Sequence, residues 1–149
     1  MLSLNVTVEN DKVVIKGLQE MAAEMPQALK NTMKRGAIGT HREAFDFLSG
    51  AKGNPGGYPV PVETGHLRRL LDFLPPGKSK GGFSAGPLES IVYDSAIYSR
   101  TIHDGTGSSA KFGARPFITD GFEAFNRGDQ LVQIADEEVA KVIAKRGFK

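Results

Sequence analysis

The stretch that decides the fold is LQEMAAEMPQALKNTMKRGAIGTHREAFDFL, residues 18–48. Its apolar residues recur at the three-and-four spacing of one helix face. Pro26 interrupts the run, and a proline inside a helix costs about 3 kcal/mol or more, whereas the first turn tolerates it. We therefore expect a short helix that ends near Met25, or a kink there, followed by a long helix over residues 26–48. Ordinary core packing explains the methionines on this face better than an adaptable binding face does.

Gly36 and Gly39 lie in the middle of this run and weaken it as a helix. We expect them to allow close packing against another element, with a bend in the helix as the second explanation. Upstream, residues 2–8 (LSLNVTV) alternate apolar and polar side chains, which predicts a half-buried strand. Residues 12–16 (KVVIK) resemble a return strand. The sequence thus predicts an N-terminal hairpin before the long helix.

Two segments rich in glycine and proline, residues 49–61 and 75–87, predict long loops on either side of a short helix. This helix is expected to start near Gly65, with Thr64 as its N-cap. Its apolar stripe consists of Leu67, Leu70, Leu71 and Leu74. The pair that projects from its other side is Arg68 and Arg69.

The C-terminal half indicates two strands followed by two helices. We expect strands around residues 90–94 and 97–103, with Asp94 and Ser95 as a turn or bulge between them. A third glycine-rich loop follows. Pro116 suits the first turn of the next helix, because the proline ring fixes a helical φ and needs no donor there.

The last helix has an apolar stripe formed by Leu131, Ile134, Ala135, Val139, Val142 and Ile143. Asp129 is the expected cap, and Glu137 stands four residues before Lys141, a spacing that supports helices. Acidic residues come first in this helix and basic residues last, as the helix dipole favours. Together the elements predict one α+β domain over residues 1–149. We expect a small antiparallel sheet, with the long helix and the C-terminal helix packed on it.

Composition limits the classes of protein to which the chain can belong. Its 149 residues are 40% hydrophobic, enough for one domain with its own core. The absence of cysteine excludes disulfides and thiolate metal sites. With 19 basic and 17 acidic side chains, a net charge of +2 is too balanced to favour general nucleic-acid binding. We find no signal peptide at the start and no run of about 20 apolar residues, the length that a membrane span needs.

Residues capable of chemistry are few and scattered. No histidine has a second histidine or a cysteine at ligand spacing. His103 and Asp104 are adjacent, and a carboxylate can orient an imidazole for catalysis, but neighbours on a strand point to opposite faces. Residues 77–79 (Gly-Lys-Ser) lack the upstream glycine of a phosphate loop, because Asp72 stands in its place. We therefore expect no catalytic activity, no cofactor and no metal site.

Three blocks resemble a known family. Residues 61–71 (PVETGHLRRLL) resemble its Pro-Val-x-Thr-Gly-x-Leu-Arg segment. Residues 98–107 (YSRTIHDGTG), followed by 114–118 (ARPFI), are similar to its strand Tyr-x-x-x-(Ile/Val)-Glu-x-Gly-Thr and its Ala-Arg-Pro-Phe block. The chain thereby resembles the tail-completion, or neck, proteins of long-tailed bacteriophages and prophages. It departs from the pattern where His103 and Asp104 replace the usual acid, and where a proline after the last block is missing.

The resemblance implies a structural virion protein, assembled in the bacterial cytoplasm and located at the neck or tail. Such proteins form a ring of identical subunits, a hexamer or a dodecamer, which completes the tail and joins it to the head. The implied partners are head-completion or connector proteins and tail-tube or terminator proteins. DNA would pass through the lumen without sequence-specific binding, and no membrane is involved.

Three alternatives remain beside this reading. One is a tail terminator or another minor tail component. A second is a nucleic-acid-binding module that grips phosphate with loop lysines, namely Lys52, Lys78, Lys80 and Lys111. A small hydrolase that uses His103 and Asp104 is disfavoured, because no partner nucleophile can be assigned.

The hypothesis of a subunit interface centres on residues 98–117. We expect residues 98–102 to be sheet, 105–113 to be an arm that settles on a neighbouring subunit, and 115–117 to anchor the chain again. Phe117 would be buried, and Arg115 would pair with Asp104 or Glu63. The expected interface residues are Tyr98, Ile102, Asp104, Gly105, Thr106, Arg115, Pro116, Phe117, Arg68 and Arg69.

Overall fold

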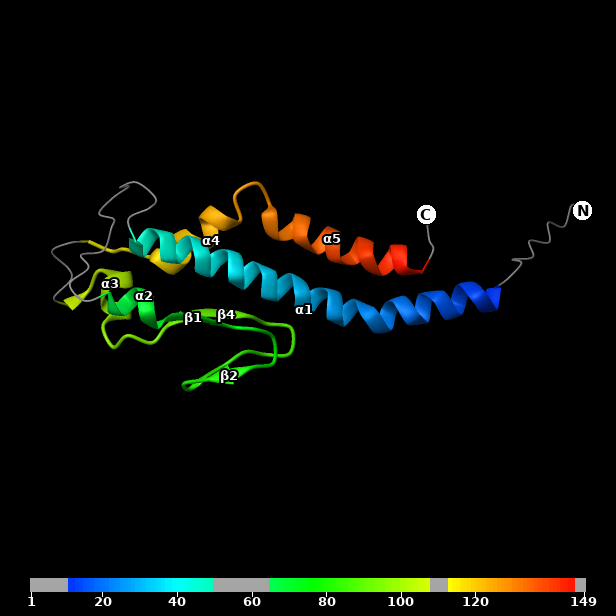
Figure 1. The fold of residues 1–149 in the computed structure, drawn as a ribbon, viewed down its shortest axis with the longest axis horizontal. Coiled ribbons are helices and arrows are strands. Elements are labelled where there is room, and N and C mark those ends of the chain that lie inside the picture. Colours follow the sequence, from blue (N-terminus) through cyan, green and yellow to red (C-terminus); the bar gives the residue numbers. More distant parts are fainter. Residues whose placement is uncertain (1–10, 50–64, 108–112, 147–149) are drawn as a thin grey trace, which may run out of the picture.

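The computed structural model describes residues 11–49, 65–107 and 113–146. Its elements in chain order are α1 (Asp11–Ser49), α2 (His66–Leu70), β1 (Leu71–Leu74), β2 (Ser79–Lys80), β3 (Phe83–Ser84), β4 (Ile91–Asp94), α3 (Ser99–Asp104), α4 (Phe117–Phe125) and α5 (Gln130–Lys145). Helices and small antiparallel sheets together confirm the α+β class. The long helix α1 runs the length of the molecule, with α4 and α5 on one side and the strands on another (Figure 1).

Helix α1 is continuous across Pro26, so the predicted break into two helices is wrong. The ribbon changes direction within its N-terminal half (Figure 1), as a proline inside a helix requires. Residues 12–16 belong to this helix, which corrects the predicted return strand. Extending an existing helix adds one hydrogen bond for each residue fixed, and that outweighs the weak strand preference of the valines. The strand predicted over residues 2–8 lies outside the described residues.

Glycines bring α4 and α5 close to α1. A Cβ atom at Gly36 would lie 2.8 Å from Leu131 Cδ1, and one at Gly39 would lie 2.2 Å from the ring of Phe125. On the other side of the contact, a Cβ atom at Gly121 of α4 would lie 2.7 Å from the backbone nitrogen of Ala44. The prediction that Gly36 and Gly39 serve close packing is confirmed.

Polar side chains hold α5 along α1. Glu138 is only 6% exposed and accepts hydrogen bonds from Asn31 Nδ2 (3.0 Å), Arg35 NH1 (3.0 Å) and Lys141 Nζ (2.6 Å). These partners, Lys141 foremost, hold the pKa of the Glu138 carboxyl below its usual value. Glu137 bonds Arg35 at 2.8 Å, whereas Lys141 bonds Glu138, so the predicted Glu137–Lys141 support is wrong.

Helix α5 begins without the expected aspartate cap. Asp129 adopts a left-handed conformation (φ 57°), and its side chain makes no capping hydrogen bond. Instead Asn126 Oδ1 accepts a hydrogen bond from the backbone nitrogen of Leu131 at 3.0 Å. The cap therefore comes from the preceding turn, because the left-handed residue turns its own side chain away from the free amides.

Strands β1 and β4 form an antiparallel pair against α1, in the register Leu71↔Asp94 to Leu74↔Ile91. The helix predicted from Gly65 does form, but it ends at Leu70, and the next two leucines of its stripe belong to β1. Both are buried there. Pairing with β4 supplies backbone hydrogen bonds that a longer helix would lose. The contact with β4, which is distant in the chain, therefore determines where α2 ends. Thr64, the expected cap, lies outside the described residues.

The segment predicted as a loop over residues 75–87 contains a second small sheet, in which β2 pairs with β3. Gly81 and Gly82 form the two-residue connection, both with positive φ (58° and 86°). Such turns match the twist of a hairpin and favour consecutive glycines. The ring of Phe83 stacks on Tyr93 of β4 at 4.2 Å between centroids, which attaches this hairpin to the first sheet.

The strand predicted over residues 97–103 is helix α3 instead. Asp94 Oδ1 accepts a hydrogen bond from the backbone nitrogen of Ala96 at 2.8 Å, which turns the chain out of the sheet and confirms the expected turn. One helical turn follows, with the Ile102 nitrogen bonding the Tyr98 carbonyl at 3.1 Å. Gly105 then ends it in the left-handed conformation (φ 63°).

Candidate subunit interface

The three blocks of the sequence resemblance converge at one end of the molecule. Helix α2, helix α3 and the start of α4 gather around the C-terminal end of α1 (Figure 1). They share one core cluster, whose buried members are Ala44, Leu48, Leu67, Leu71, Ala96 and Phe117. Ile102 packs against this cluster from α3. Segments that are far apart in the chain thus depend on one another for their packing.

The two ends of the segment between α3 and α4 are joined directly. The backbone nitrogen of Arg115 donates to the carbonyl of Ile102 at 3.2 Å. A Cβ atom at Gly105 would lie 2.4 Å from the backbone nitrogen of Ala114, so only glycine fits this crossing. Gly105 is therefore held beside Ala114, and residues 108–112 of the predicted arm lie outside the described residues.

Phe117 anchors this point, as the sequence predicted. Its side chain is 0% exposed, and the ring of His103 meets it edge-on at 5.7 Å between centroids. Pro116 stands directly before α4 as its N-cap residue.

Arg115 is 8% exposed, and its guanidinium therefore lies beneath the surface. Asp104 is one of the two acids that we expected to pair with Arg115. Its carboxylate bonds His103 Nδ1 at 3.0 Å and Arg100 Nε at 3.4 Å. His103, and then Arg100, hold the pKa of Asp104 below its usual value. The other acid proposed for Arg115, Glu63, lies outside the described residues.

The expected interface residues divide by exposure. Tyr98, Asp104, Thr106 and Arg69 are exposed; Ile102, Gly105, Pro116 and Arg68 are half-buried; Arg115 and Phe117 are buried. The turn before α3 adds a residue that sequence reasoning missed, because Ile97 is 100% exposed. An apolar side chain within a predicted strand gives no sign of such exposure, which follows from the Asp94 turn.

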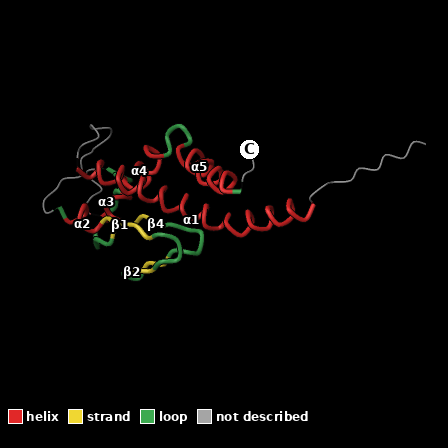
Figure 2. The backbone as a smooth tube through the Cα atoms, turned by 45° about the vertical axis from the view of Figure 1, so that its right-hand side comes forward, coloured by secondary structure: helices red, strands yellow, loops and turns green. Residues whose placement is uncertain are grey.

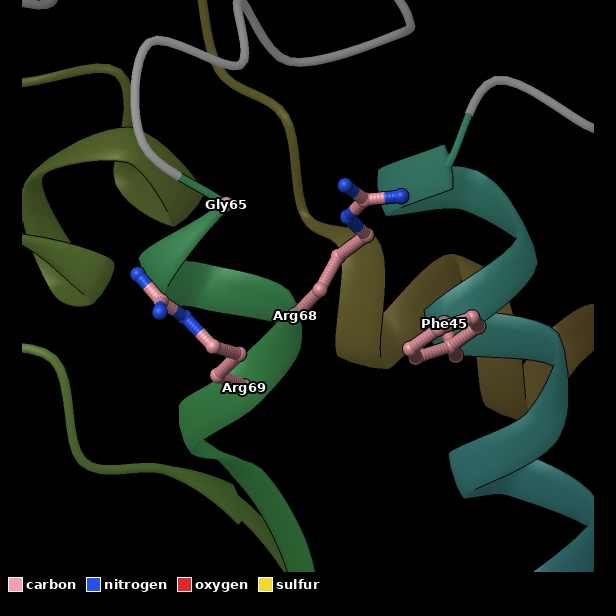
Figure 3. Close-up of a pocket in the computed structure, with 4 residues that line it drawn as sticks. All are labelled: Phe45, Gly65, Arg68 and Arg69. Carbon is pink, nitrogen blue, oxygen red and sulfur yellow. The ribbon is translucent and has the colours of Figure 1, made fainter.

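A shallow hollow of about 340 Å³ lies between α2 and α1, lined by Phe45, Gly65, Arg68 and Arg69. Figure 3 shows the side chain of Arg68 reaching toward the C-terminal end of α1, while Arg69 points away on the other side of α2. The two arginines therefore do not act as one clamp. Arg68 offers a planar donor group at the edge of the hollow that Phe45 also lines, and such a group suits a carboxylate on a partner.

His103 and Asp104 do contact each other, contrary to the expectation that they face apart. The helical conformation of α3 replaces the predicted strand, and this allows the contact. Thr119 Oγ1 of α4 lies 3.4 Å from His103 Nε2, at the outer limit of a hydrogen bond. The three side chains link α3 to α4 at the surface. Among residues 11–49, 65–107 and 113–146, no cluster of three potential metal ligands occurs.

Two of the four loop lysines, Lys78 and Lys80, lie in the described part of the chain. Lys80 bonds Asp72 Oδ2 at 2.6 Å, and this lysine is the main cause of the lowered pKa of Asp72. Lys78 lies just before the β2–β3 hairpin. Lys52 and Lys111 lie outside the described residues.

Comparisons with models of protein families, with curated proteins and with solved structures gave no match for this chain. None of the helices within residues 11–49, 65–107 and 113–146 has an apolar stretch long enough to cross a bilayer.

Proposed function

We propose that this protein is a structural component of the bacteriophage head–tail junction, where identical subunits form a ring that completes the tail and joins it to the head. The observation that carries the proposal is the convergence of the three resembling blocks on one core cluster, through Leu67, Ile102 and Phe117.

Two different surfaces at this end of the molecule suit a ring. A ring repeats one heterologous contact, in which a face of one subunit meets another face of its neighbour. Ile97 and Tyr98 offer an apolar face, with Ile97 entirely exposed. The hollow beside Phe45 and Arg68 offers a second, concave face. Burying an isoleucine side chain stabilises a contact by about 1.5–3 kcal/mol, so an exposed Ile97 favours association.

The pinned base of residues 105–114 supports the same proposal. An arm that contacts a neighbour must leave the domain at a fixed point, or its ordering would cost more entropy. The Arg115–Ile102 backbone bond and the tight Gly105–Ala114 crossing supply this fixed point. Arg115 and Phe117 are buried directly after this fixed point, and Thr106 is exposed directly after Gly105.

The test compares two charge substitutions at exposed apolar residues. Ile97→Asp should convert the ring to single subunits, as measured by sedimentation and by electron microscopy of negatively stained protein. Val132→Asp is the matched control, because Val132 is 57% exposed on α5, away from this end, and should leave the ring intact. Purified heads and tails mixed with each variant should join only with the wild type and the control.

Two results would overturn the proposal. One is a wild-type protein that stays a single subunit both alone and in the presence of heads and tails. The other is an Ile97→Asp variant that joins heads to tails as efficiently as the wild type does.

A further inference from the structure

The sheet of β1 and β4 has two outer edges, which differ in how their backbone groups are satisfied. Hydrogen-bonded pairs alternate along antiparallel strands. The Ser95 nitrogen donates to the Leu70 carbonyl at 3.3 Å, directly before the first pair of the register, Leu71↔Asp94. The backbone groups of Leu71 therefore point away from β4, and those of Asp94 and Val92 point away from β1.

The outer edge of β1 is satisfied by its own surroundings. The Leu71 nitrogen donates to the carbonyl of Leu67 in α2, and the Leu71 carbonyl accepts from His41 Nε2 of α1 at 3.2 Å. Two residues further on, the Phe73 nitrogen donates to the carboxylate of Asp72 at 2.8 Å. These groups are therefore not available to a further strand.

The outer edge of β4, at residues 90, 92 and 94, lacks such partners. Within residues 11–49, 65–107 and 113–146, neither backbone group of Val92 and no amide of Asp94 finds a partner at this edge, although the Asp94 carbonyl accepts from Ser99 Oγ at 3.2 Å. In the same described ranges, Ser90 Oγ and Asp94 Oδ2 are shielded from solvent and make no hydrogen bond. An unpaired strand edge of this kind is a template for another strand.

We propose that the outer edge of β4 accepts residues 2–8 of a neighbouring subunit as an added strand. The inference rests on the proposed function, because the ring is what holds a neighbour within reach. In such an addition the backbone hydrogen bonds supply the affinity, and alternate side chains fit the surface beside the edge. Residues 2–8 alternate apolar and polar side chains, as a strand with one covered face does.

The other stretches outside the described residues suit a strand poorly. Residues 50–64 include Pro55, Pro59 and Pro61, each of which lacks the amide that a strand ladder needs. Residues 108–112 and 147–149 are short and lack a run of alternating apolar side chains. Next to the β4 edge, Leu88 is 48% exposed and offers an apolar contact to the leucines and valines of residues 2–8.

The donor is a second copy, because residues 2–8 cannot reach β4 of their own chain. His41, which contacts Leu71 of the sheet, lies about 45 Å along α1 from Asp11 at the helical rise per residue. Val92 lies within about 7 Å of that level, since it is two residues from the partner of Leu71. Over about 30 Å thus remain, whereas the chain from Asp11 back to Asn5 spans at most about 21 Å when fully extended.

The first turns of α1 extend past the end of α5 and past the strands in both views (Figures 1 and 2). The segment that precedes α1 therefore starts from a point that projects from its own subunit. Ordering this segment costs conformational entropy, so free subunits should exchange strands only weakly. Contacts in the ring raise the local concentration of the donor, and the strand should add there.

Hydrogen–deuterium exchange, read by mass spectrometry on the peptide that contains Val92, tests the edge. We expect the Val92 amide to exchange at least about tenfold more slowly in the assembled wild type than in single subunits of Ile97→Asp. A variant with Asn5→Pro and Val6→Pro should lose this protection, because proline cannot donate to a strand ladder. The matched control, with Asn5→Thr and Val6→Ile, keeps every amide and should keep the protection.

Introduced cysteines identify the donor, and the chain has none of its own. Val6→Cys and Val92→Cys subunits with tags of different mass are mixed, assembled and oxidised, and Leu4→Cys replaces Val6→Cys to sample a second register. We expect the mixed disulfide to exceed either homodimer severalfold. Val132→Cys on α5 replaces Val92→Cys as the control and should give no mixed product. Circular dichroism checks that each variant is folded.

Three results would overturn the inference. One is a ring in which the Val92 amide exchanges as fast as in Ile97→Asp. Another is a proline variant whose ring protects Val92 as well as the wild type does. The third is a disulfide that closes within a single chain carrying both Val6→Cys and Val92→Cys. Sedimentation reports the ring separately: a wild type that stays a single subunit contradicts the proposed function as well, whereas a ring with an unprotected edge contradicts only the added strand.

Discussion

Replacing Gly121 by alanine should destabilise the protein, although alanine favours helices. Gly121 lies inside α4, where it meets α1 at Ala44, a residue with 0% exposure. The new Cβ atom would lie 2.7 Å from the backbone nitrogen of Ala44 and 2.9 Å from both its Cα and its Cβ. These atoms belong to the backbone and core of a long helix, so the two helices must move apart.

The size of the effect follows from two opposing contributions. The change from glycine to alanine inside a helix contributes about 1 kcal/mol in favour of folding. Overpacking a tight contact costs about 1–3 kcal/mol, and it costs more when backbone must shift. Because backbone must shift here, the cost lies in the upper part of that range, about 2–3 kcal/mol. We therefore expect a net loss of about 1–2 kcal/mol in the free energy of unfolding, which lowers Tm by about 3–6 °C in a protein of this size.

The matched control is Gly36→Ala in α1. There the nearest atom to the new Cβ is the terminal Cδ1 of Leu131 at 2.8 Å, the end of a flexible side chain. Rotation of Leu131 relieves the contact, so the helix preference of alanine should prevail and stability should rise by up to about 1 kcal/mol. Urea unfolding followed by circular dichroism measures both variants. The reasoning is refuted if Gly121→Ala is as stable as Gly36→Ala or the wild type.

Three further predictions test the polar contacts. Glu138→Gln should lower the free energy of unfolding by about 1.5–3 kcal/mol, because the buried acceptor loses its charge, while exposed Glu137→Gln should change it little; urea unfolding at pH 7 compares them. Burial raises the pKa of Asp94 from 3.8 to about 6, so the folded protein binds this proton more tightly than the unfolded chain does. Asp94 therefore makes stability fall as pH rises from about 4 to about 6, and Asp94→Asn should flatten that slope in thermal melts. Asn126→Ala removes the side chain that caps α5 and should lower the free energy of unfolding by about 1 kcal/mol. Asp129→Gly should raise it, because glycine adopts a positive φ without strain. Equal losses of stability in the two variants would show that Asp129 caps the helix after all.

The sequence alone determined the parts of the fold that depend on local periodicity. The long apolar run over residues 18–48 and the stripe of α5 specify helices, because side chains three and four residues apart must share one face. Gly36 and Gly39 indicated a close contact, and Phe117 an anchor, from their residue types alone. For the interface, the sequence supplied the three resembling blocks but not their relative positions.

Tertiary structure decided every feature in which two local solutions compete. Residues 12–16 and 97–103 have side chains that suit a strand, yet no strand pairs with them in the described chain, and a helix satisfies their backbone within the segment itself. Leu71 belongs to a strand and not to the preceding helix, because it pairs with Asp94 of β4. The exposure of Ile97 and the burial of Arg115 likewise depend on neighbours distant in the chain. A side chain's environment is set by what packs against it, and local spacing does not contain that information.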